Sequence, residues 1–80
     1  MVNGDVYVGM IENDKMSGIG QYNWVDGQSY QGEYVEGAET GRGMKRYRSG
    51  STYVGDFVDD HFHGKGCFKW ADGQMYRGEW

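Results

Sequence analysis

Two histidines and one cysteine are the residues of this sequence best suited to hold a metal ion. His61, His63 and Cys67 lie close together in the chain. A structural zinc site needs about four protein ligands, and a catalytic site needs about three with a water molecule. The sequence has no further histidine or cysteine to complete such a set. We therefore expect incidental loop histidines, no bound metal and no cofactor.

Residue groups for nucleophilic or acid–base catalysis are missing as well. No serine, cysteine or carboxylate recurs with a histidine at the spacing of a triad or dyad. The sequence does contain three G-x-G steps, at Gly18–Gly20, Gly41–Gly43 and Gly64–Gly66. No helix is expected after any of them, although a phosphate-binding loop requires one. The sequence thus predicts a chain that is not an enzyme.

Basic side chains concentrate in the second half of the chain and could attract an anionic partner. Six are expected on one face of a sheet, with two acidic residues between them: Arg42, Arg46, Arg48, Lys65, Lys69 and Arg77. A cluster of roughly four to eight basic residues can bind anionic phospholipid head groups. The alternative is a solvated face with cross-strand ion pairs. Nucleic acid is not expected as a partner, because the net charge is −4 and no aromatic residues are interleaved with these basic ones.

The amino-acid composition limits the kinds of secondary structure that can hold these residues in place. The 80 residues include 15 glycines, one cysteine and no proline, and 16% are aromatic. Disordered chains are poor in aromatic residues, so glycine and aromatics together indicate tight turns and close packing around large rings. One cysteine excludes an internal disulfide framework and fits a reducing, cytoplasmic setting. No apolar run is long enough for a transmembrane helix or a signal-peptide core.

A repeat of 23 residues organises the chain. It is clearest in two series of four residues each: Tyr7, Tyr30, Tyr53 and Tyr76, and Ile11, Tyr34, Phe57 and Trp80. Fourteen of the 15 glycines and 12 of the 13 aromatic residues fall on the repeat, and only Gly37 and Phe62 lie outside it. Such regularity predicts a repeat architecture in which each unit is one supersecondary element.

The repeating unit resembles the MORN repeat. The motif reads Asp26-Gly27-x-x-Tyr30-x-Gly32-x-Tyr34, then Gly41-x-Gly43-x-x-x-Tyr47. The resemblance covers the whole chain, with repeats at about residues 3–25, 26–48 and 49–71 and a partial repeat over 72–80. Because the last unit stops in mid-repeat, we expect a segment of a longer array.

Three departures from the repeat pattern are mild. Ile11 replaces the usual aromatic residue, and Ser49 replaces the aspartate of the turn. Lys45 stands where the neighbouring units have Tyr22 and Phe68. These changes make the first and second units less regular without altering the period.

Alternation of residue types at period two predicts two strands in each unit. In the first unit the strands flank a polar hairpin loop of six residues, Glu12–Ser17. The expected cross-strand partners are Tyr7 with Tyr22, Gly9 with Gly20 and Ile11 with Gly18. Glycine within a strand often marks close approach by another group, which here would be an aromatic ring.

Parity predicts the connection between units. A three-residue loop, Val25–Gly27, keeps Tyr22 and Tyr30 on one face, with Gly27 in the left-handed conformation. A two-residue turn would place the next aromatic set on the opposite face. Gly27→Val should therefore disrupt the register, whereas Gly37 is expected to accept alanine with much less effect. The predicted fold is all-β, a single-layer antiparallel meander of tandem hairpins with about seven strands.

The two faces of this sheet carry different residues. The aromatic face is the expected core and also the candidate interaction surface, since one layer cannot bury its own face: Tyr7, Tyr22, Trp24, Tyr30, Tyr34, Tyr47, Tyr53, Phe57, Phe68, Trp70, Tyr76 and Trp80. The opposite face carries the basic residues in the second and third units. In the first unit it carries an apolar patch: Val6, Val8, Met10, Ile19 and Val25.

The resemblance implies a non-enzymatic scaffold or interaction module with protein partners or self-association. MORN arrays occur in cytoskeletal, ciliary and membrane-contact proteins, often as dimerisation or docking units. Two alternatives stay open. One is a peripheral membrane module that binds anionic phospholipid. The other is an accessory array of a larger enzyme, such as a phosphatidylinositol phosphate kinase or a SET-domain lysine methyltransferase.

Overall fold

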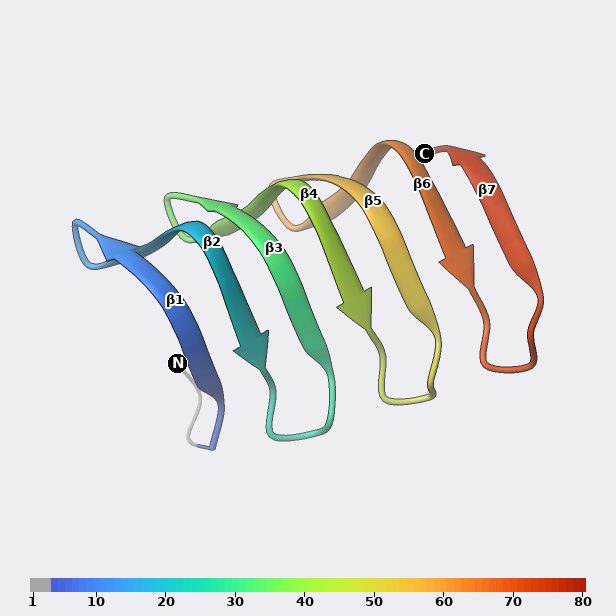
Figure 1. Cartoon of the computed structure of the whole chain (residues 1–80), viewed down its shortest axis with the longest axis horizontal. Coiled ribbons are helices and arrows are strands. Elements are labelled where there is room, and N and C mark those ends of the chain that lie inside the picture. The colour runs from blue at the N-terminus through green and yellow to red at the C-terminus, as the bar shows by residue number, and fades with distance from the viewer. Residues whose placement is uncertain (1–3) are drawn as a thin grey trace.

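Residues 4–80 form one antiparallel sheet whose seven strands follow one another in chain order (Figure 1). The computed structural model describes residues 4–80. The strands are β1 (Val6–Glu12), β2 (Lys15–Asn23), β3 (Ser29–Val35), β4 (Ala38–Arg46), β5 (Thr52–Val58), β6 (His61–Lys69) and β7 (Met75–Glu79). The predicted all-β meander of tandem hairpins is confirmed. No helix of the described residues is long and apolar enough to cross a membrane.

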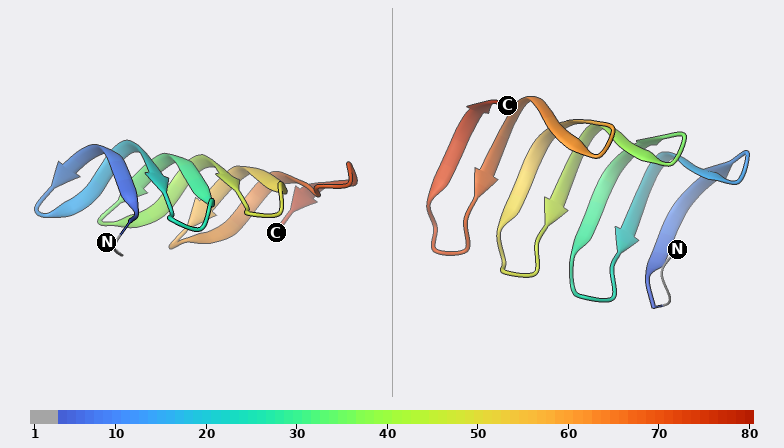
Figure 2. Two further views of the ribbon diagram at one scale, coloured as in Figure 1. Left: turned by 90° about the horizontal axis from the view of Figure 1, so that it is seen from below. Right: turned by 180° about the vertical axis from the view of Figure 1, so that it is seen from behind.

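The sheet is an open, curved ribbon with no second layer over residues 4–80 (Figure 2). Its extents along the principal axes are 39, 26 and 14 Å. The strands bend along their length, so the hairpin turns at one end of the strands curl over one face of the sheet. Each unit adds two strands to the ribbon, which places equivalent residues of successive units side by side.

Each strand contributes one glycine to a row that crosses the whole sheet. The members pair in sequence across six strand pairs: Gly9, Gly20, Gly32, Gly43, Gly55, Gly66 and Gly78. A Cβ added at Gly55 or Gly66 would collide with the phenol of Tyr53. The Tyr53 hydroxyl lies over this backbone and donates a hydrogen bond to the carbonyl of Asp56 at 2.9 Å. The predicted approach of aromatic rings to strand glycines is confirmed.

The hairpin turns within units are shorter than the sequence predicts. β1 and β2 are joined by only two residues, Asn13 and Asp14, with φ of 52° and 64°. Two consecutive positive φ values define the turn that matches strand twist. The expected six-residue loop is therefore wrong. Glu12 is the last residue of β1 and residues 15–17 are the first of β2, so these residues extend the strands. The corresponding turn of the second unit is Glu36–Gly37.

Gly37 consequently has a conformational role that the period did not reveal. Its φ is +86°, in the region where a side chain with a Cβ is strained. Alanine at Gly37 is therefore strained, as valine at Gly27 is, which corrects the reason for expecting a much smaller effect at Gly37. Asp14 and Asp60 adopt the same kind of conformation in the other units, because aspartate and asparagine visit this region more readily than other residues.

A bulge corrects the predicted register of the first hairpin. Tyr7 pairs with Tyr22 and Gly9 with Gly20, as predicted, but Ile11 pairs with Met16 instead of Gly18. The register shifts after Gly9 because β2 carries two extra residues at that point. Ile11 is therefore left exposed, and Met16 takes the place beside the aromatic residues.

The connections between units have the predicted three-residue geometry. The amide of Trp24 donates to the carbonyl of Gln28 at 2.9 Å, and the amide of Gly27 donates to the carbonyl of Trp24 at 3.1 Å. The loop is therefore 25–27, with Gly27 at a φ of +102°. Tyr22 and Tyr30 then face each other on adjacent strands, which confirms the parity prediction.

The core is a line of rings along one face. Tyr30 and Tyr53 have no exposed surface, and Phe57 between them is nearly as buried. Its ring centroid lies 5.1 Å from that of Tyr30 and 5.0 Å from that of Tyr53, both edge to face. Such pairs contribute about 0.5–1.5 kcal/mol each beyond the burial of area. The ring–ring contacts link neighbouring units, so each unit depends on the next one for its core.

Phe62 belongs to this core, although the sequence analysis placed it outside the repeat. Its ring stacks on that of Tyr53 with centroids 3.9 Å apart. Counting back by the period leads to Glu39 and then to Met16. The position is therefore part of the repeat, and it escaped notice because its three members are chemically unlike.

Candidate functional site

The predicted aromatic surface divides into a buried part and an accessible part. Five of its twelve residues are buried: Tyr22, Tyr30, Tyr34, Tyr53 and Phe57. Four more are half-buried: Tyr7, Trp24, Tyr47 and Phe68. The remaining three lie at the C-terminal end and are 43–45% exposed: Trp70, Tyr76 and Trp80. A partner on this face would therefore contact the half-buried and exposed rings.

Burial also makes the hydroxyl groups of the core tyrosines harder to ionise. Loss of solvation, together with the nearby carboxylate of Glu39, raises the pKa values of Tyr30 and Tyr34 well above the ordinary value of 10.0. The Tyr30 hydroxyl is further held by its donation to the carbonyl of Glu33 at 2.9 Å. The Tyr30 phenol is therefore a structural hydrogen-bond donor.

A charged pair interrupts the aromatic line in the second unit. Glu39 and Lys45 occupy the repeat positions that hold Met16 and Tyr22 in the first unit and two phenylalanines in the third. Glu39 Oε1 lies 3.6 Å from Lys45 Nζ. Lys45 is one of the predicted departures from the repeat, whereas Glu39 was not predicted, although the period of 23 residues aligns it with Met16 and Phe62.

Glu39 is a buried carboxylate with incomplete hydrogen bonding. The residue is 3% exposed, and its Oε1 accepts no hydrogen bond from the described residues. Burial and the neighbouring Asp60 raise the pKa of Glu39, while Lys45 opposes the shift. The Lys45 ammonium lies 5.2 Å from the ring centroid of Trp24 and 5.9 Å from that of Tyr47. Such distances are typical of cation–π interactions.

Beside this pair lies a pocket of about 370 Å³ on the aromatic face, which we call the Lys45 pocket. It is lined by Met16, Tyr22, Trp24, Tyr34, Gly37, Glu39, Lys45 and Asp60. Asp60 belongs to the next hairpin turn, and its carboxylate accepts a hydrogen bond from the Glu39 amide at 2.8 Å. Three rings and two carboxylates therefore surround one lysine.

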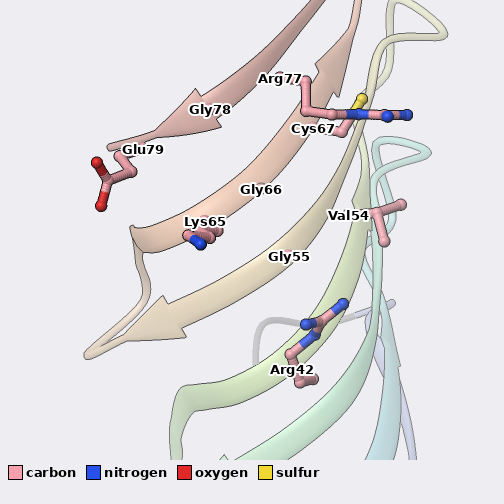
Figure 3. A pocket seen from close by; sticks show the side chains of 9 residues that line it. All are labelled: Arg42, Val54, Gly55, Lys65, Gly66, Cys67, Arg77, Gly78 and Glu79. Atoms are coloured by element: carbon pink, nitrogen blue, oxygen red, sulfur yellow. The ribbon is translucent and has the colours of Figure 1, made fainter.

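The predicted basic residues do not form one cluster. Arg42, Lys65 and Arg77 line a shallow groove of about 420 Å³ on the opposite face, over β4–β7 (Figure 3). Arg46 and Lys69 both pair with Thr52 in a different row of the sheet. Arg48 follows the end of β4.

The groove is not purely cationic. Arg42 Nε lies 3.5 Å from a carboxylate oxygen of Asp56, an exposed pair of the kind that contributes about 0–1 kcal/mol. Glu79 also lines the groove, as do Val54 and Cys67. The two acidic residues that were predicted among the basic ones, Asp56 and Glu79, thus lie beside them in the structure.

The histidines and the cysteine are not brought together as a metal site. No group of three or more metal-ligating side chains occurs within residues 4–80. His61 pairs with Val58 and His63 with Asp56 at one end of the β5–β6 hairpin. Cys67 pairs with Val54 further along the same two strands and lines the groove.

The apolar patch of the first unit is accessible to solvent. Its five residues are all at least half exposed: Val6, Val8, Met10, Ile19 and Val25. They lie on β1, on β2 and in the loop that follows it. Valine and isoleucine suit strands even when exposed, so this patch is compatible with sheet formation alone.

Comparison with known proteins shows the family to which the chain belongs. The sequence model of the MORN repeat family matches residues 7–29, 30–52 and 53–75. These matches span most of the chain at the period of 23 residues, and the chain belongs to the MORN repeat family.

The chain is also similar to part of a curated protein. A stretch of 42 residues is 45% identical to phosphatidylinositol 4-phosphate 5-kinase 1 of Oryza sativa subsp. japonica. The stretch covers 52% of this chain and 5% of the kinase. The similarity therefore concerns a small segment of that protein.

Proposed function

We propose that the chain is a non-catalytic interaction array that docks protein partners or a second copy on its aromatic face. The observation that carries this proposal is the single-layer sheet, which leaves Trp70, Tyr76 and Trp80 each more than 40% exposed. Exposed apolar patches on folded proteins mark interaction sites. Large aromatic side chains are also the residue type that contributes most at interfaces.

The sheet edges support self-association as one form of this function. β1 and β7 each pair on only one side within the described residues. An unpaired strand edge presents amides and carbonyls that can continue the sheet in another chain. Tyr76 on β7 and Trp80 just beyond it place exposed rings beside one such edge.

Sedimentation velocity at micromolar concentration tests this form of the proposal. We expect the sedimentation coefficient to rise with concentration, and the variant Tyr76→Ser/Trp80→Ser to reduce the rise because it removes ring surface at the β7 edge. Val8→Ser, which removes apolar surface on the opposite face, is the matched control. A folded chain that stays monomeric over the whole range would contradict self-association and leave docking of other proteins.

Two other functions have specific support. Similarity to part of a phosphatidylinositol 4-phosphate 5-kinase favours an accessory array attached to a lipid kinase. The groove with Arg42, Lys65 and Arg77 favours binding of anionic phospholipid head groups. In either case the array itself supplies contacts and no catalytic group.

A further inference from the structure

The Lys45 pocket differs from its equivalents in a way that core packing does not require. The first and third units fill the same positions with Met16 and Tyr22, and with Phe62 and Phe68. Phe62 and Phe68 pack with ring centroids 6.1 Å apart. Replacing a buried ion pair by apolar residues is often neutral or stabilising. The charged pair of the second unit is therefore better explained by recognition than by stability.

The charges of the pocket are unbalanced. Two carboxylates, Glu39 and Asp60, face one ammonium, that of Lys45. Glu39 Oε1 accepts no hydrogen bond from residues 4–80, and Lys45 Nζ at 3.6 Å is beyond hydrogen-bond distance. One further cation in the pocket would balance the charge.

The walls of the pocket also favour a cation. The rings of Tyr22, Trp24 and Tyr34 line it, and the face of an aromatic ring attracts ammonium groups. Lys45 already makes this interaction with Trp24. The pocket of about 370 Å³ has room beside Lys45 for the alkyl chain and ammonium of another lysine.

We propose that the Lys45 pocket binds a lysine side chain of a partner polypeptide. This inference rests on the proposed protein-docking function and names the chemistry that the aromatic face recognises. A lipid amine is disfavoured because its phosphate would lie near the acidic turn residues Glu36, Asp59 and Asp60. A peptide lysine carries only neutral amide groups beside its ammonium.

The three tryptophans allow a direct test by NMR. The probe is the capped tripeptide acetyl-Gly-Lys-Gly-amide, titrated into the 80-residue chain while the indole N–H signals are recorded. We expect the Trp24 signal to shift with the lysine peptide and to move more than those of Trp70 and Trp80. The neutral peptide acetyl-Gly-Gln-Gly-amide should leave Trp24 unshifted.

Matched variants separate recognition from folding. Asp60→Asn should weaken the Trp24 response, whereas Asp59→Asn, which removes the same charge from a neighbour that does not line the pocket, should leave it unchanged. Glu39→Phe/Lys45→Phe installs the residue pair of the third unit and should abolish the response while the chain stays folded. Cooperative unfolding in urea verifies the fold of each variant.

Several results would overturn the proposal. They are an absent Trp24 shift, an equal response to both peptides, equal effects of the two aspartate variants, or an unchanged response in the double variant. A larger Trp24 shift with phosphatidylethanolamine vesicles than with the lysine peptide would assign the pocket to a lipid amine instead. Sedimentation of the unmodified chain does not depend on any of these results, so a failure here is distinguishable from a failure of the docking function.

Discussion

At the scale of single residues, tyrosine and glycine form one structural unit. Tyr7, Tyr30, Tyr53 and Tyr76 each donate a hydrogen bond to the carbonyl three residues later, at 2.8–3.0 Å. Each phenol can reach that carbonyl only because strand glycines leave space beneath the ring. The spacing Tyr-x-Gly is thus a steric requirement, since any Cβ at the glycine would displace the ring.

Glu39 should give the chain a characteristic dependence of stability on pH. Burial raises its pKa above the ordinary value of 4.5, so the folded chain binds its proton more tightly than the unfolded chain does. The free energy of unfolding contributed by this group therefore falls as the pH rises above that value. Urea denaturation at a series of pH values from about 4.5 upward should show this slope, and Glu39→Gln should remove it.

The exposed Glu12 provides the control for this measurement. Glu12→Gln removes the same negative charge at an exposed position of β1 and should change the slope less than Glu39→Gln does. Slopes that the two variants change equally would contradict the assignment to Glu39. The comparison between variants cancels the contributions of the other carboxylates.

At the scale of elements, two kinds of turn alternate along the ribbon. Two-residue turns close the hairpins within units, and three-residue loops join one unit to the next. Both kinds of turn set a register in which aromatic residues of adjacent strands pair directly, as Tyr7 does with Tyr22 and Tyr22 with Tyr30. Directly paired residues lie on the same face of the sheet. The bulge after Gly9 shows that a hairpin can also absorb extra residues without losing this register.

Gly27→Val should lower the free energy of unfolding by about 1–3 kcal/mol, the usual strain of a non-glycine residue in a disfavoured backbone region. No atom lies within 4 Å of the added Cβ, so the strain comes from the φ of +102° alone. Gly37→Asn should have a smaller effect, because asparagine tolerates a positive φ. Chemical denaturation checks both variants, and the reverse ranking would contradict the loop geometry.

At the scale of the whole molecule, the docking function that we propose depends on which surface of the ribbon a partner covers. The rings of the aromatic face lie on every strand except β4, while the groove of the opposite face covers only β4–β7. The two surfaces lie on opposite sides of one layer. A protein partner on one face therefore leaves the other free for a second contact.

The phospholipid alternative predicts a difference between two triple charge reversals. Arg42→Glu/Lys65→Glu/Arg77→Glu should abolish co-sedimentation with anionic vesicles if the groove holds the head group, since each basic residue contributes about 1 kcal/mol. Arg46→Glu/Arg48→Glu/Lys69→Glu changes the charge equally outside the groove and should weaken binding less. Equal loss in both variants would indicate unspecific attraction, and equal binding of neutral vesicles would rule out recognition of anionic lipid.

Much of the fold could be predicted because period and parity are properties of the sequence itself. Tyr22 and Tyr30 had to share a face, and this condition alone required the three-residue loop with Gly27. The two-residue hairpin turns could not be predicted in this way, because polar residues such as Glu12 and Lys15 suit both a strand edge and a loop. Only backbone hydrogen bonding between β1 and β2 decided between them.

The sequence by itself determined the repeat, the strand order and the face on which the rings lie. The tertiary structure alone decided what those residues enclose. Glu39, Lys45 and Asp60 come from β4 and from the turn after β5, and nothing in their spacing shows that they meet. They converge because the bulges and the curl of the ribbon bring successive hairpin turns together, as in the bond from the Asp60 amide to the Glu39 carbonyl at 3.0 Å. Curvature is a sum of small backbone rotations over many residues, and no local pattern in the sequence records it.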